Sequence, residues 1–178
     1  MNSAGILADA FERIHEAVHA AVEGVPPEDL NARLDEDANS IAWLVWHLAR
    51  VQDDHVADAA ESEQVWFAED WASRFELPLE KDSTGYGHSS AQAASVRVAS
   101  GDLLLGYFDA VHEQTLGFVR GLDGRALDRV VDDAWSPPVT LGVRLISVIA
   151  DDLQHAGQAA FVRGALERRH RAEDPVRA

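Results

Sequence analysis

The sequence of 178 residues contains no cysteine. Disulfide bonds, cysteine-ligated metal centres and a protein thiol nucleophile are therefore excluded. Any sulfur chemistry would have to be brought by a small molecule. Lysine is nearly absent as well, since Lys81 is the single example, whereas arginine and alanine are plentiful. This usage is typical of GC-rich bacterial genomes of the actinobacterial type.

Positive charge is scarce, because 15 Lys and Arg residues stand against 31 Asp and Glu residues and give a formal net charge of −16. Contacts to nucleic-acid phosphates need clustered Lys and Arg, so we expect no nucleic-acid partner. No stretch approaches the roughly 18–20 apolar residues of a membrane span. The first 15 residues also lack the basic and then apolar order of a signal peptide. We therefore expect a cytoplasmic protein with no membrane partner.

Four long segments show helical spacing of their apolar residues: about 4–22, 39 or 40 to 60, 100 or 102 to 121, and 140–168. No strand alternation or internal repeat is visible. The pattern predicts an all-α protein with a four-helix bundle, whose core commonly holds metals between facing helices. We expect one domain over residues 1–170, followed by a flexible tail over residues 171–178.

A long loop rich in aromatic residues, 61–99, separates the second and third of these helices. A short helix is expected around 64–75, and loops of this length in a compact domain are usually functional or disordered. Its aromatic content argues against disorder. We expect it to pack over one end of the bundle, although four of its aromatic residues could also pack on a second subunit of a homodimer, namely Trp66, Phe67, Trp71 and Phe75.

Three residues suggest a metal site. Asp151 and His155 are four residues apart in an apolar helical segment, so they share one helix face. His47 lies in the apolar run 41–48 and can supply a third ligand from another helix. Three protein ligands and a vacant position are typical of a catalytic rather than a structural metal site.

Other readings of these residues stay open. A buried Asp–His ion pair explains Asp151 and His155 about as well on spacing alone, and Asp152 could replace Asp151 as the partner at i, i+3. Three further histidines are expected on solvated helix faces: His15 and His19 on the first helix and His112 on the third. Both His55 and Asp54 lie too far along the helix from His47 to share its ion.

Two polar residues follow His155 on the same helix. Gln158, at i+3, can face the same cavity and hydrogen-bond a ligand or water. Arg163, at i+8, could hold a substrate carboxylate or pair with an acidic neighbour.

The segments 39–48 (NSIAWLVWHL), 151–158 (DDLQHAGQ) and 162–164 (VRG) resemble the DinB-like superfamily, close to its mycothiol-dependent branch. The similarity runs from about residue 5 to 168. It implies a four-helix bundle with an open divalent metal site, usually zinc or nickel, in which His47 and His155 match the first and last ligands. Asp151 stands where relatives carry His or, in the maleylpyruvate isomerase-like branch, Glu. A carboxylate there still suits a borderline ion.

The resemblance also implies an activity: transfer of a low-molecular-weight thiol such as mycothiol to an electrophile, or an isomerisation that uses a thiol adduct. A metal-bound thiol is deprotonated, which gives a strong nucleophile at neutral pH. The electrophile would then bind beneath the 61–99 loop near Trp46, Tyr86 or His88. The alternatives are a metal- or ligand-binding bundle without activity, a purely structural bundle, and hydrolysis by metal-activated water.

Overall fold

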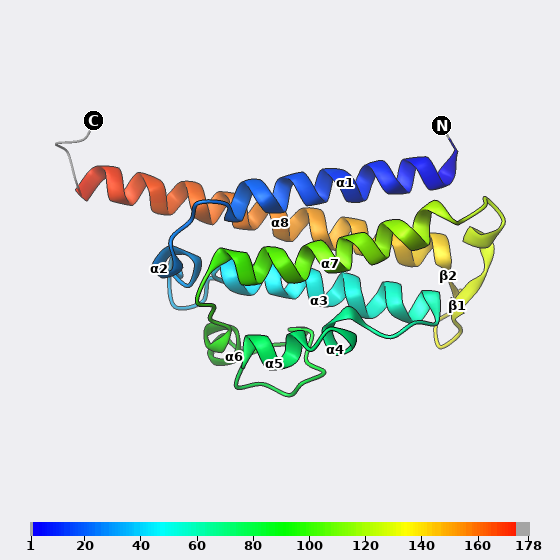
Figure 1. Ribbon diagram of the computed structural model, residues 1–178, viewed down its shortest axis with the longest axis horizontal. Coiled ribbons are helices and arrows are strands. Elements are labelled where there is room, and N and C mark those ends of the chain that lie inside the picture. The colour runs from blue at the N-terminus through cyan, green and yellow to red at the C-terminus, as the bar shows by residue number, and fades with distance from the viewer. Residues whose placement is uncertain (1, 174–178) are drawn as a thin grey trace.

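The computed structural model describes residues 2–173, and four long helices form its bundle: α1 (Ser3–Val22), α3 (Ile41–Ala60), α7 (Gly101–Arg120) and α8 (Leu141–Glu173). The first and last helices run in one direction and the middle two in the other (Figure 1). Each helix packs on two others, so that α1 contacts α7 and α8, and α3 contacts the same two helices. The predicted all-α four-helix bundle is confirmed.

The helix boundaries follow from residues that can be read in the sequence. The side chains of Asn2, Ser40 and Ser100 each accept a hydrogen bond from a backbone N–H in the first turn of α1, α3 and α7. Such caps satisfy N–H groups that have no partner within the helix. At the other end of α3, Glu61 adopts a left-handed conformation and its N–H bonds back to the last turn.

The connections contain short elements that periodicity did not predict. The link from α1 to α3 includes α2 (Pro27–Leu30), and the link from α7 to α8 includes a 3-10 helix (Ala126–Asp128) and an antiparallel pair, β1 (Val130–Asp132) and β2 (Val139–Thr140). The sequence shows no strand alternation at this pair. Strands of two or three residues are too short to show alternation.

Residues 61–99, which we call the cover segment, contain α4 (Val65–Ala68), α5 (Trp71–Phe75) and α6 (Ser90–Ser95). They lie along the flank of the bundle formed by α3 and α7 rather than over one end (Figure 1). The rings of Trp66, Trp71 and Phe75 pack around Tyr107 of α7, at centroid distances of 5.0, 5.7 and 5.9 Å. These three aromatic residues are buried within the chain. Of the four residues that could have packed on a second subunit, only Phe67 is exposed at the surface.

Helix α8 is the longest element and continues through residues 171–173 of the predicted tail. Residues 174–178 of that tail lie outside the described residues. Within residues 2–173, no helix combines the length and the apolar character that crossing a membrane requires.

Candidate metal centre

Three side chains from two helices meet at the contact between α3 and α8. His47 comes from α3, and Asp151 and His155 come from one face of α8; one ligand atom from each lies within 4.8 Å of the others. Nε2 of His155 is 3.6 Å from Oδ1 of Asp151. The ring of His155 stands nearly perpendicular to that of His47, with centroids 4.8 Å apart. We call these three residues the candidate metal triad.

The ring of His47 is fixed by two neighbours. Its Nδ1 donates a hydrogen bond to the carbonyl oxygen of Thr84, because a carbonyl can only accept, and this leaves Nε2 with a free lone pair. On one face the ring stacks on Trp43, with centroids 4.5 Å apart and planes 20° apart. Burial lowers the pKa of His47, so the neutral, ligand-competent form is favoured.

His155 is oriented in the same way by a side chain on its own helix. Nδ1 of His155 donates to Oε1 of Gln158 over 3.0 Å, which directs Nε2 toward Asp151. The interaction with Asp151 raises the pKa of His155, and that with His155 lowers the pKa of Asp151. Metal-bound histidines usually donate their second N–H to an oxygen acceptor in this manner.

The donor set fits a divalent ion. Two imidazoles and a carboxylate suit zinc and nickel. Oδ2 of Asp151 is buried and has no hydrogen-bond partner among the described residues. A buried oxygen without a partner is rare in folded proteins and often indicates a missing water or ion.

Asp152 points elsewhere. Its side chain is 0% exposed, and neither carboxylate oxygen has a partner within residues 2–173. Burial, and then the charge of Asp151, raises the pKa of Asp152 well above its usual value. The geometry therefore groups Asp151, and not Asp152, with the two histidines. Asp152 is nevertheless the more deeply buried of the two carboxylates, since Asp151 is only partly buried.

Two cavities meet at His47. One of about 570 Å³ is lined by His47 and Asp151 together with Asp54, His55 and Trp135. The other, of about 390 Å³, lies on the cover-segment side and is lined by residues that include Asn39, Trp43, His47, Gly85 and His88. Tyr86, 93% exposed, contributes to the wall of both. Small molecules therefore have room on two sides of the histidine.

Comparison with known proteins identifies the family. Residues 6–168 match the mycothiol-S-transferase family. The chain belongs to this family. The structure is also similar to the crystal structure of a conserved protein from Enterococcus faecalis, with 30% sequence identity, a TM-score of 0.86, and coverage of 92% of this chain and 96% of that chain. No curated protein matches the sequence. The resemblance to the mycothiol-dependent branch of the DinB-like superfamily is thus confirmed.

Two of the residues predicted to contact the substrate line the cavities of this mycothiol-S-transferase family member. Tyr86 lines both cavities, and His88 lines the smaller one. His88 is already engaged, because its Nδ1 accepts from Nε1 of Trp43 and its Nε2 bonds Oγ of Ser83. Trp46 is 1% exposed and stacks on His88, so it supports the cavity wall from behind.

The two predicted contacts on α8 lie outside both cavities. Gln158 is exposed and bonds His155, as described above. Arg163 donates to the carbonyl oxygens of Ala20 and Glu23 at the end of α1 and pairs with Glu167. Arg163 therefore joins α8 to α1. Of the two roles considered for it from the sequence, the structure shows the pairing with an acidic neighbour, which is Glu167.

Sequence reasoning missed Trp43 and Gly85. Trp43 precedes His47 by four residues, so the spacing that paired Asp151 with His155 could have found it. Gly85 has φ +93°, and a Cβ there would lie 2.7 Å from Nδ1 of His47. Only glycine combines this backbone conformation with such close approach to the ring.

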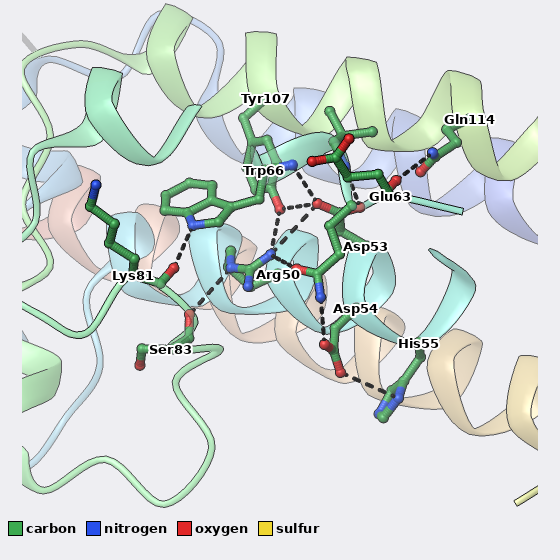
Figure 2. A network of polar contacts seen from close by, with 12 residues as sticks. Arg50, Asp53, Asp54, His55, Glu63, Trp66, Lys81, Ser83, Tyr107 and Gln114 are labelled. Carbon is green, nitrogen blue, oxygen red and sulfur yellow. Dashed lines mark hydrogen bonds and ion pairs between the residues drawn. The ribbon is translucent and has the colours of Figure 1, made fainter. Parts of the chain in front are cut away.

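A buried ion pair anchors the cover segment to the bundle (Figure 2). Arg50 and Asp53 of α3 are both 0% exposed and lie 3.6 Å apart. Asp53 accepts hydrogen bonds from the backbone N–H groups of Val65 and Trp66 and from the hydroxyl of Tyr107. The carboxylate thus holds the start of α4 against α3 and α7.

Arg50 extends this network toward the candidate metal triad. Its Nη1 donates to Oε1 of Gln64, and its Nε donates to the carbonyl oxygen of Ser83, the residue before Thr84 (Figure 2). Since Thr84 in turn bonds His47, the ion pair fixes the backbone that orients the histidine.

The remaining histidines correct one expectation. His112 is 7% exposed, so its predicted place on a solvated face is wrong. His15 and His19 are partly buried and both bond Asp109 of α7. Their ring positions are set by packing between α1 and α7, which the sequence of either helix alone does not reveal.

Proposed function

We propose that this protein is a divalent-metal-dependent thiol S-transferase, which adds a mycothiol-type thiol to an electrophile with zinc, or alternatively nickel, held by His47, Asp151 and His155. The observation that carries the proposal is the convergence of these three side chains beside open cavities. The mycothiol-S-transferase family supports a thiol substrate. The absence of cysteine agrees with it, because the nucleophilic sulfur then belongs to the co-substrate.

A divalent metal bound by the triad would supply the charge that lowers the pKa of a thiol to the point where it is ionised at neutral pH. The chain's own residues do the rest. Thr84 and Gln158 accept the Nδ1 protons of His47 and His155, so that each ring keeps one orientation and presents Nε2. Asp151 offers an oxygen that has no competing partner among the described residues.

The two cavities divide the substrates. The larger one borders both His47 and Asp151 and gives the thiol access to the triad. The smaller one, beneath the cover segment, is the place for the electrophile, with the indole of Trp43 as its apolar wall. Tyr86 lies between the two, where the new bond to sulfur would form.

The test is consumption of monochlorobimane by mycothiol in the presence of zinc-loaded protein, followed by fluorescence of the adduct. We expect the wild type to accelerate the reaction and His155→Ala to return it to the uncatalysed rate. The matched control is His170→Ala, the same substitution at an exposed histidine of α8, which keeps wild-type activity. If the zinc-bound wild type gives no turnover with mycothiol or another bacterial thiol, the transferase is rejected in favour of a binding protein without activity.

A further inference from the structure

A second cluster of metal-type side chains lies on the other side of the bundle, where α1 contacts α7. Nε2 of His15 and Nε2 of His19 are 2.9 and 2.7 Å from the same oxygen, Oδ1 of Asp109. One ligand atom from each of the three residues lies within 4.8 Å of the others. The ring order of the bundle places this contact opposite the α3–α8 contact that holds the candidate metal triad.

The arrangement repeats the elements of the first site. His15 and His19 are four residues apart on one helix face, and a neighbouring helix supplies the third group. Nδ1 of His19 bonds Oε1 of Glu23 over 2.8 Å, which places a carboxylate behind the ring as in many metal sites. The side chains of His15, His19 and Asp109 are 29, 23 and 45% exposed, so an ion can reach them from solvent.

An independent observation beside this cluster is an imidazole nitrogen without a partner. His112, one turn after Asp109 on α7, is 7% exposed and stacks on His15 with ring centroids 4.4 Å apart. Its Nδ1 is buried and has no hydrogen-bond partner within residues 2–173. The other ring nitrogen of His112, Nε2, lies 3.5 Å from Oε2 of Glu12, so His112 packs beside the cluster and is not one of the three grouped ligands.

We propose that His15, His19 and Asp109 form a second divalent cation site that joins α1 to α7, selective for an ion that accepts imidazole and carboxylate ligands, such as Zn²⁺ or Ni²⁺. On binding, the ion replaces the protons that the imidazoles now share with Asp109, and these protons pass to solvent. None of the residues that line the two cavities beside His47 belongs to this cluster. The second site is therefore separate from the two cavities proposed to hold the substrates, and the effect of its cation is on the stability of the α1–α7 contact.

Calorimetric titration of the metal-free protein with Zn²⁺ counts the sites. The key comparison uses a His155→Ala background, in which the first site is disabled, so the result does not depend on the proposed transferase activity. We expect this protein to bind one equivalent of Zn²⁺ and to lose it when His15→Asn and His19→Asn are added. His170→Asn, outside both clusters, serves as the control. Added to the His155→Ala protein, it should leave the binding of one equivalent of Zn²⁺ unchanged.

Thermal unfolding gives a second readout. An ion that binds only the folded state raises Tm, so Zn²⁺ should raise Tm of the His155→Ala protein and leave Tm of the version with the two added substitutions unchanged. Should the two substitutions prevent folding, Asp109→Asn keeps the side-chain shape and is expected to lose the same equivalent. Equal zinc binding with and without His15, His19 and the Asp109 charge would overturn the second site and leave an ion-pair network.

Discussion

Nδ1 of His47 lies 2.5 Å from the carbonyl oxygen of Thr84, so the cover segment and the candidate metal triad are hydrogen-bonded directly. The next residue, Gly85, continues over the same ring in a left-handed conformation. The orientation of His47 and the position of the cover segment therefore depend on each other. Substitutions in the cover segment should change metal affinity although none of its residues belongs to the triad.

Gly85→Ala is the sharpest test of this dependence. The new Cβ would lie 2.7 Å from Nδ1 of His47, so either the ring or the loop must move. Loss of a group that orients a metal ligand typically costs about 10- to 100-fold in metal affinity. We expect zinc affinity, measured by competition with a chelator, to fall at least about 10-fold, in line with that range.

Gly87→Ala is the matched control. Gly87 also has a positive φ, of +71°, but a Cβ there has nothing within 4 Å. This substitution brings only the backbone strain of a left-handed residue, about 1–2 kcal/mol. Its zinc affinity should equal that of the wild type. If both alanine variants bind zinc equally well, the contact between Gly85 and His47 does not control the site.

Gln158→Leu tests the support of His155. The leucine cannot accept the Nδ1 proton, so the ring loses the interaction that directs Nε2 toward Asp151. Zinc affinity is expected to fall about 10-fold. Gln154→Leu, at another exposed position of α8 whose side chain bonds only the backbone of Ala150, should have no effect. A loss of equal size in both variants points to a general change in α8 instead.

Asp53→Ala tests the anchor of the cover segment. The substitution leaves Arg50 as a buried charge without its partner and removes the acceptor for Val65, Trp66 and Tyr107. Breaking a buried pair typically costs about 3–5 kcal/mol of unfolding free energy. Denaturant unfolding should show this loss, whereas Asp58→Ala, at an exposed position of the same helix, should stay within about 0.5 kcal/mol of the wild type.

Tyr86→Ala tests the wall shared by the two cavities. Because the side chain is 93% exposed, its removal should leave Tm unchanged. We expect KM for the electrophile to rise while zinc content stays constant. Phe161→Ala is the control, because it removes another exposed aromatic ring, 64% exposed, from a position of α8 that lines neither cavity, and it should leave KM unchanged. Identical kinetics for Tyr86→Ala and the wild type would remove Tyr86 from the binding surface.

The long helices could be predicted because their signals are local. Apolar spacing gave their extent, and Ser40 and Ser100 mark two of the starts. The pairing of Asp151 with His155 was also local, since i, i+4 spacing fixes a shared face. That His47 meets them was inferred from its apolar surroundings and from the family resemblance, and it depends on how α3 packs on α8.

The features that could not be predicted from the sequence are those that depend on packing between segments. The partner of His47 is the backbone carbonyl of Thr84, which has no side-chain signature. The full burial of Asp152 and of His112 follows from the rotation of each helix about its own axis, which neighbouring helices set. The strands β1 and β2 exist only as partners of each other, so neither shows a pattern by itself.

The proposed transferase requires that the candidate metal triad hold an ion with a position open to a small-molecule thiol. The most direct measurement is the near-ultraviolet spectrum of the Co²⁺-loaded protein during titration with mycothiol. Since the chain has no cysteine, a sulfur-to-cobalt charge-transfer band can come only from the added thiol. We expect this band to appear and saturate in the wild type and to be absent in His155→Ala. A Co²⁺-loaded wild type without such a band would mean that the thiol does not bind the metal.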